Sequence, residues 1–281
     1  EEGSGNSVND TSGNGNTGTW SGTGTHWDNG KYGNAGKFNG SDDYVNVADS
    51  SSLSPTGNLT LEAWIKYNVL PTSTASYPII GKSDSGNRNG YVLYYTKTAT
   101  PGFNMEICAA SPCGGSTTPN EAAVANTWYH VVGTYDGSNI RIYVNGILKT
   151  TTASTTNPSD GAGALRLGYN VGNGYQNFSQ INLDQVRIYN YARTAAQIAW
   201  DYNRGSPVAH YKLDECQGTT AYDSSGNGNS GTITIGATGT QTSAGTCGSA
   251  VSTEAWSNGA TGKLNSSLNF DGTDDYVSIT N

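Results

Sequence analysis

The sequence predicts an all-β protein, a two-sheet antiparallel jelly-roll sandwich followed by the opening part of a second copy of the same fold. Three observations support this prediction. Segments of alternating apolar and polar residues recur with turn residues between them, which is typical of sandwiches. Helical signals occur in only one short segment, and no strand–helix–strand pattern appears. A stretch from the start of the chain also recurs near its end.

The clearest strand is LTLEAWI, residues 59–65. Its leucines, alanine and isoleucine alternate with Thr60, Glu62 and Trp64, so the two sets lie on opposite faces of a strand. We expect the aliphatic set to point into the sandwich and the other set to point outward. Further strands are predicted at 91–95, 103–107, 164–168 and 181–190.

Residues 128–146 predict a hairpin whose turn is Asp136-Gly137. In its second strand the isoleucines and valine alternate with Arg141 and Tyr143, which we expect to face outward.

In the segment 181–190, alternation places Asp184 on the inward face with Val186 and Ile188. The same alternation places Arg187 and Tyr189 on the outward face.

One helix is predicted shortly after the last of these strands. Thr194 and Gln197 form a capping box, and Gly205 is expected to end the helix.

The repeat divides the chain. Residues 1–19 resemble 214–232, and FNGSDDYVNV (38–47) resembles FDGTDDYVSI (270–279). We therefore expect a first domain over 1–204 that lacks its opening strand. We expect 205–281 to form a linker and the N-terminal third of a second repeat, as in a window on a tandem array. The segment PVAHYKL (207–213) would be the opening strand of the second copy.

Composition excludes several classes of protein. The net charge is −8, with 14 basic and 22 acidic residues and no basic run, which argues against binding nucleic acid or anionic membranes. No apolar stretch approaches the roughly 20 residues that span a bilayer, so we expect no membrane insertion. The low lysine content and abundant Gly, Asn, Ser and Thr suit an extracellular or cell-surface protein.

The four cysteines favour disulfides. Cys108 and Cys113 bracket a short turn, and Cys216 and Cys247 form a second, isolated pair. Because no Cys-x-x-Cys motif or Cys/His cluster is present, zinc binding is disfavoured. Four free thiols are the alternative.

The chain resembles the LamG-like (laminin G-like) jelly-roll domains of the concanavalin A-like lectin/glucanase superfamily, which are common in tandem in bacterial surface proteins. The segments that carry the resemblance appear in the family's order: DTSGNGNTG (10–18), FNGSDDYV (38–45), LTLEAWI (59–65), WYHVVGTYDG (128–137), IYVNG (142–146) and LDQVRIYNYARTAAQI (183–198). The resemblance implies two stacked antiparallel sheets, often a structural calcium ion, and a role in binding glycans or proteins.

Calcium prefers hard oxygen ligands, and two loops and one strand offer them. The candidate ligands are Asp10, Asn14, Asn16, Asp42 and Asp184. The alternatives are an Asx-turn at Asp10 and an arginine partner for a buried Asp184.

Related enzymes on this sandwich use an E-x-D-x-x-E arrangement, which is absent here. The seven glutamates are scattered, and His130 suits a structural role, so we predict no catalytic residues. Acids on different strands could still approach one another.

The outward positions carry aromatic and hydrogen-bonding side chains of the kind that binds sugars. These candidate carbohydrate-binding residues are Glu62, Trp64, Arg141, Tyr143, Arg187 and Tyr189. Packing within the sandwich is the alternative role for Trp64.

We therefore expect a non-catalytic extracellular module for glycan binding or adhesion, whose partner is a glycan or a surface protein. One alternative is a structural subunit of a surface fibre or layer, self-associated by β-strand exchange. Another is an accessory module of a polysaccharide-degrading enzyme.

Overall fold

The computed structural model divides the chain into two compact units, Glu1–Tyr202 and Asn203–Asn281. Each unit is described by itself. The structure describes residues 2–84, 89–109, 113–118, 120–159, 162–171, 177–204, 207–256 and 266–280.

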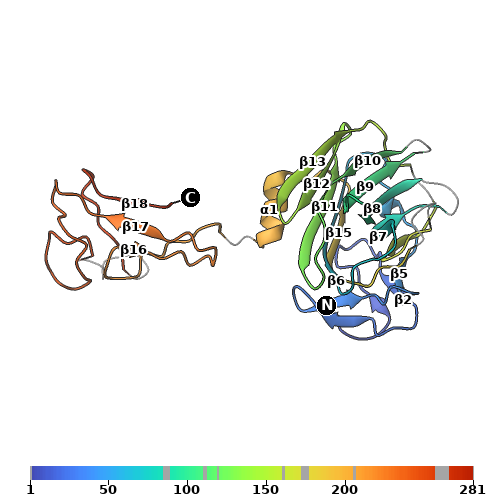
Figure 1. The fold of residues 1–281 in the computed structure, drawn as a ribbon, viewed down its shortest axis with the longest axis horizontal. Helices are drawn as coiled ribbons and strands as arrows, with labels where there is room; N and C mark the ends of the chain where they lie inside the picture. Colours follow the sequence, from blue (N-terminus) through green and yellow to red (C-terminus); the bar gives the residue numbers. More distant parts are fainter. Residues whose placement is uncertain are drawn as a thin grey trace. The chain divides into compact units, whose positions relative to one another are not determined.

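The first unit is a sandwich of two antiparallel sheets (Figure 1), which confirms the predicted fold class. Sheet A has eight strands, in the order β1-β2-β5-β14-β7-β8-β9-β10. Their bounds are β1 (Ser7–Val8), β2 (Gly18–Ser21), β5 (Tyr44–Val47), β14 (Leu165–Leu167), β7 (Ala75–Lys82), β8 (Gly90–Lys97), β9 (Gly102–Cys108) and β10 (Gly114–Thr117).

Sheet B has seven strands, in the order β13-β12-β11-β6-β15-β4-β3. Their bounds are β13 (Ile147–Ala153), β12 (Asn139–Val144), β11 (Trp128–Tyr135), β6 (Leu59–Tyr67), β15 (Ile181–Tyr189), β4 (Asn34–Lys37) and β3 (Trp27–Asn29). A short 3-10 helix, η1 (Ser51–Leu53), lies between β5 and β6 in the chain.

The core lies between the inner faces of the two sheets. On β6 the predicted inward residues Leu59, Leu61, Ala63 and Ile65 are all 0% exposed. Each large apolar side chain buried in this way stabilises the fold by roughly 1.5–3 kcal/mol. The alternation of residues 59–65 therefore predicted the inner face correctly.

The hairpin β11–β12 also forms as predicted, with its turn at Asp136-Gly137. Oδ1 of Asp136 accepts hydrogen bonds from the backbone N–H groups of Ser138 and Asn139, at 2.9 and 2.7 Å. Gly137 has φ +89°, a left-handed conformation that favours glycine.

The predicted helix is α1 (Ala195–Asn203), and its capping box is present. The N–H of Gln197 donates to the Thr194 hydroxyl at 3.3 Å, and the N–H of Thr194 donates to Oε1 of Gln197 at 2.9 Å. The predicted helix end at Gly205 lies outside the described residues. The buried Ile198 packs with Val132 and Tyr143 on the outer face of sheet B, beside which α1 lies in Figure 1.

The predicted inward position of Asp184 is wrong. A β-bulge shifts the register of β15 against β6 between Asp184 and Arg187, and Gln185 within it has φ +49°. The bulge inserts an extra residue, so Asp184 pairs with Trp64 and Arg187 pairs with Glu62. Both side chains therefore lie on the outer face of sheet B.

The second unit contains one small sheet, in the order β16-β17-β18. Its strands are β16 (Thr220–Ala221), β17 (Gly231–Thr234) and β18 (Tyr276–Ser278). Thr232 pairs with Thr220 and Ser278, as Thr19 pairs with Ser7 and Asn46 in the first unit. The β1-β2-β5 arrangement thus recurs in the same register, around a core that contains the fully buried Trp256.

The structure forms both predicted disulfides. Cys108 bonds to Cys113 in the first unit, and Cys216 bonds to Cys247 in the second. Among the described residues no cysteine is free.

Candidate functional site

The outer face of sheet B is covered, so our expectation of exposed binding residues there is wrong for three of them. Glu62, Trp64 and Tyr143 are 0%, 4% and 4% exposed. The reason is α1, whose Tyr202 stacks on Trp64 with ring centroids 5.6 Å apart. The alternation identified the face, but it could not reveal that a helix from a later part of the chain covers it.

Beneath this helix lies a buried network of charged side chains. Oε1 of Glu62 lies 3.1 Å from Nε2 of His130 and accepts a hydrogen bond from Nη1 of Arg187 at 3.0 Å. Arg187 also lies 3.7 Å from Asp201 of α1, to which Arg193 donates as well. Burial and the charge of Glu62 raise the pKa of Asp201, and the two arginines oppose this rise. The network therefore fixes α1 to the sheet.

The remaining predicted sugar-binding residues have partners within the sandwich. Arg141 is paired with Asp136, and the guanidinium of Arg193 lies 4.6 Å from the ring centroid of Tyr189. Arg141, Tyr189 and Arg187 are each partly exposed, and their binding role stays a prediction.

The predicted calcium loop is organised by hydrogen bonds. The N–H groups of Ser12 and Asn16 donate to the two carboxylate oxygens of Asp10, each at 2.8 Å. Burial raises the pKa of Asp10, but these hydrogen bonds outweigh it and leave the pKa lowered. The side chain of Asn14 donates to Ser12, and that of Asn16 accepts from Ser50. The Asx-turn alternative accounts for this loop.

The other two predicted acids also accept hydrogen bonds from neighbouring groups in the fold. Asp42 accepts from the side chains of Thr23 and Asn39, at 3.0 and 2.6 Å. The buried Asp184 accepts from the N–H of Tyr32 at 2.8 Å. Within the described ranges, Asp10, Asp42 and Asp184 do not join any cluster of three potential metal ligands. Calcium binding by any of the five candidate ligands therefore stays a prediction.

The second unit does gather three acids, at the positions equivalent to 39, 42 and 43. Asp271, Asp274 and Asp275 each offer a carboxylate oxygen within 4.8 Å of the others. In the first unit the equivalent of Asp271 is Asn39, whose amide donates to Asp42. A carboxylate cannot make this donation, so the second unit has three acids where the first has two acids and an amide donor.

The outer face of sheet A is the surface that the sequence analysis did not single out. Residues paired across adjacent strands share a face, so one row runs through Asn46, Arg166, Gly81, Val92 and Glu106. Nη1 of Arg166 is buried and has no hydrogen-bond partner among the described residues. The position of Arg166 between the apolar Leu165 and Leu167 could have indicated in the sequence that its side chain faces outward.

Aromatic side chains border this row. Tyr44 alternates with the inward Val45, and its ring lies 5.6 Å from that of Tyr169. Tyr169 in turn stacks on Phe178 with centroids 4.4 Å apart. All three rings are partly exposed. Sheet A thus combines flat apolar rings with an arginine donor.

Two acids of the sandwich approach one another, although they lie on different elements. Glu62 and Asp201 both contact Arg187. They are 0% and 8% exposed and lie beneath α1, so a dissolved substrate does not reach them. This arrangement suits a structural role for His130 as well.

Among the described residues, no helix is long and apolar enough to cross a membrane.

Residues 39–199 match the family model described as the Concanavalin A-like lectin/glucanases superfamily. The comparison with curated proteins finds no match.

Solved structures share the fold. The binding domain of Paraclostridial Mosquitocidal Protein 1 is 17% identical with a TM-score of 0.54, covering 73% of this chain and 51% of that one. Domain 4 of AbnA, a GH43 extracellular arabinanase from Geobacillus stearothermophilus, in complex with arabinotriose, is 20% identical with a TM-score of 0.52, covering 68% and 90%.

A third similar structure is the botulinum neurotoxin serotype D ligand binding domain in complex with N-acetylneuraminic acid. It is 16% identical with a TM-score of 0.53, and the match covers 73% of this chain and 49% of that one. The chain therefore spans about half the length of the two toxin domains. At these identities the likeness shows the fold alone.

Proposed function

The chain belongs to the Concanavalin A-like lectin/glucanases superfamily, and on that premise we propose that it is a non-catalytic extracellular module that binds glycans on the outer face of sheet A. Structures of the same fold, described with arabinotriose and N-acetylneuraminic acid, support a glycan as the ligand class. Its place is a cell surface or a secreted protein, and the partner is a glycan, free or carried by a surface protein.

The observation that carries this proposal is the unpartnered Nη1 of Arg166. Arg166 is partly exposed, and its Nη1 lacks an acceptor, which is costly for a desolvated donor; a ligand hydroxyl or carboxylate at this side chain would supply the acceptor. Tyr44 and Tyr169 offer ring faces on which the C–H face of a sugar can pack. The guanidinium suits the hydroxyl groups of a sugar, and the tyrosine rings suit its apolar C–H face.

The non-catalytic part of the proposal rests on the acids. The E-x-D-x-x-E arrangement is absent, and the neighbouring pair Glu62 and Asp201 is buried and paired with arginines. A general acid and a nucleophile need access to the scissile bond.

A glycan array with neutral and acidic oligosaccharides tests the function. We expect the protein to bind at least one class of glycan on the array. Arg166→Ala should lower the affinity at least about tenfold, which corresponds to about 1.4 kcal/mol of binding free energy. Lys149→Ala, which removes a partly exposed cation from β13 of sheet B, is the matched control and leaves binding unchanged. Failure to retain any glycan, or equal losses for both variants, would contradict the proposal.

For divalent cations, we propose a binding site in the second unit. Asp271, Asp274 and Asp275 provide the hard oxygen ligands that calcium prefers, and Oδ1 of Asp274 is buried without a partner among the described residues. A cation there would offset the repulsion between the three carboxylates.

Assembly by strand addition, within a tandem array, is the second candidate function. In the first unit β5 pairs with β14 on the side away from β2, whereas the outer edge of β18 has no strand partner among the described residues. A free edge accepts another strand. The proposed donor segment 207–213 instead makes one bridge, between Tyr211 and Asp223, and packs within its own unit. Sedimentation that shows concentration-dependent polymers would support assembly, and a monomer at all concentrations would contradict it.

A further inference from the structure

The second unit contains a pocket beside the Cys216–Cys247 disulfide that the sandwich site does not involve. Its volume is ≈ 680 Å³, within the roughly 300–1,000 Å³ of ligand pockets. Its wall combines polar and apolar surface, and Glu215 is the one charged residue that lines it. The lining side chains are Glu215, Gln217, Thr219, Thr220, Tyr222 and Thr246.

Glu215 gives the pocket an unused hydrogen-bond acceptor. Its Oε1 accepts from the N–H of Tyr222 at 2.8 Å, which fixes the carboxylate. Its Oε2 is buried and has no partner among the described residues. A buried carboxylate oxygen is costly when unpaired, so the site favours a ligand that brings hydroxyl donors.

Tyr222 supplies a flat apolar surface beside this acceptor. Its side chain is 61% exposed, while its backbone is held by Glu215. The threonine hydroxyls and the amide of Gln217 both donate and accept. Stacking surface, carboxylate and hydroxyls are thus within one cavity.

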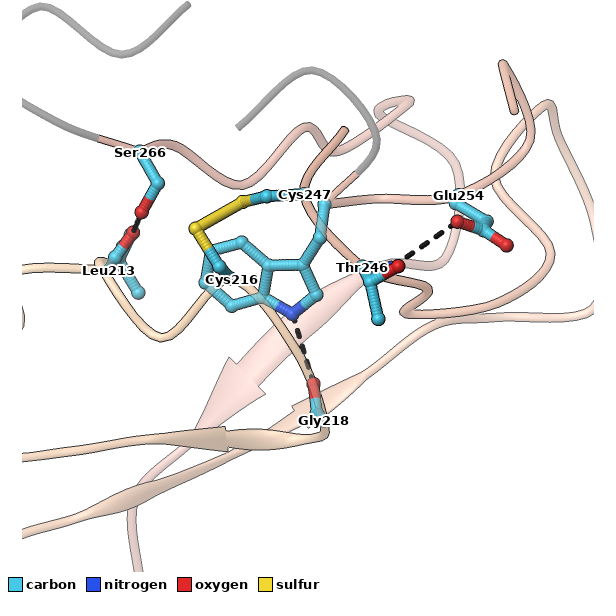
Figure 2. The surroundings of a disulfide bond; sticks show 8 residues. Leu213, Cys216, Gly218, Thr246, Cys247, Glu254 and Ser266 are labelled. Carbon is cyan, nitrogen blue, oxygen red and sulfur yellow. Dashed lines mark hydrogen bonds between the residues drawn. A yellow bond between two sulfur atoms is a disulfide. The ribbon is translucent and has the colours of Figure 1, made fainter. Parts of the chain in front are cut away.

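The disulfide joins the two chain segments that carry the lining residues Gln217 and Thr246. The N–H of Cys247 donates to the carbonyl of Cys216 at 2.8 Å, and Gln217 forms a bridge with Thr246. The indole of Trp256 donates to the carbonyl of Gly218 at 3.0 Å. Figure 2 shows Gly218 and Thr246 beside the two cysteines. A wall fixed in this way lowers the entropy cost of binding.

We propose that this pocket is a second carbohydrate site, which binds a single neutral sugar residue whose ring packs on Tyr222 and whose hydroxyls donate to Glu215. No lysine or arginine lines it, and its one charge is negative, so acidic sugars and phosphates are repelled. This pocket is a different site from the outer face of sheet A, which carries the cationic Arg166. Loss of binding at one site therefore does not require loss of binding at the other.

The first unit provides an internal comparison. Glu2 accepts from the N–H of Asn9 at 2.8 Å, as Glu215 accepts from Tyr222. However, Asn9 lacks the aromatic ring, and the stretch that carries Thr246 and Cys247 has no counterpart in the first copy. The carboxylate geometry is thus shared, whereas the ring and the disulfide-held wall belong to the second unit.

The test is an NMR titration of the isotope-labelled full chain with the neutral methyl glycosides of glucose, galactose, arabinose and N-acetylglucosamine. We expect at least one to shift the amide signals of Thr220, Tyr222 and Thr246. Glu215→Gln keeps the acceptor for the Tyr222 N–H and should weaken binding at least about tenfold. Tyr222→Ala should weaken it similarly.

Glu2→Gln is the matched control and should leave the titration unchanged. Arg166→Ala should also leave these shifts unchanged, which separates this site from the sheet A face. The proposal is overturned if no neutral glycoside shifts these signals, or if Glu215→Gln binds as the unaltered chain does. Equal shifts with N-acetylneuraminic acid would likewise overturn the preference for neutral sugars.

Discussion

Oε1 of Glu62 and Nε2 of His130 lie 3.1 Å apart on neighbouring strands, and both residues are 0% exposed. The two residues lie on the outer face of sheet B, a position that is solvated in many antiparallel sheets. Arg187 completes the group by donating to the same carboxylate oxygen. The burial of these polar groups results from α1, which covers the face.

Removal of Glu62 should strongly destabilise the first unit. Glu62→Ala removes the acceptor of Nη1 of Arg187 and the partner of Nε2 of the buried His130. Loss of one partner of a buried ion pair costs about 3–5 kcal/mol. The matched control is Glu121→Ala, which removes a partly exposed pair with Lys149 and should cost about 0–1 kcal/mol. Urea denaturation measures both free energies of unfolding. Equal losses would show that the buried network does not stabilise the fold.

Loss of the second disulfide should destabilise its unit more than loss of the first. Cys216 and Cys247 are 31 residues apart, and Cys108 and Cys113 are 5 apart. Because a longer loop restricts the unfolded chain more, chain entropy gives about 3–4 kcal/mol for the second and about 2 kcal/mol for the first. Hydrogen exchange of the paired Cys-to-Ser variants measures each unit separately. A larger effect in the first unit would refute the loop-entropy argument.

The loop at Asp10 should lose stability in acid. Hydrogen bonds from Ser12 and Asn16 lower the pKa of Asp10 below 3.8 in the folded state, against the opposing effect of burial. A carboxyl group whose pKa is lower in the folded state than in the unfolded state stabilises the protein when the pH is above the unfolded-state pKa. This stabilisation is lost as the pH falls through the folded-state pKa. Between about pH 5 and about pH 2, the free energy of unfolding should therefore fall less with decreasing pH in Asp10→Asn than in the unaltered chain. Urea denaturation at a series of pH values measures it. An unaltered pH dependence in this variant would count against the prediction.

Calcium should raise the melting temperature of the second unit. A ligand that binds only the folded state stabilises it by mass action. Asp274→Asn should abolish the rise, whereas Asp42→Asn, the equivalent change in the first unit, should retain it. Calorimetry with added calcium or with EDTA measures the effect. A melting curve insensitive to both would remove calcium from the description of this chain.

Local structure could be predicted from the sequence. The alternation in residues 59–65 predicted the inner face of β6, Thr194 and Gln197 predicted the start of α1, and the spacing of the cysteines predicted two disulfides. Each of these signals depends on neighbours in the chain or on the period of a strand. For this reason they could be interpreted without a tertiary structure.

Which surfaces are exposed depends on contacts between residues that are distant in the sequence. A helix that begins at Ala195 covers Trp64, and a bulge beside Gln185 turns Asp184 to the outer face. Strands distant in sequence bring Arg166 between Asn46 and Gly81. Long-range packing and a single inserted residue in a strand leave no periodic signal in the sequence, so the binding surface could not be inferred from alternation alone.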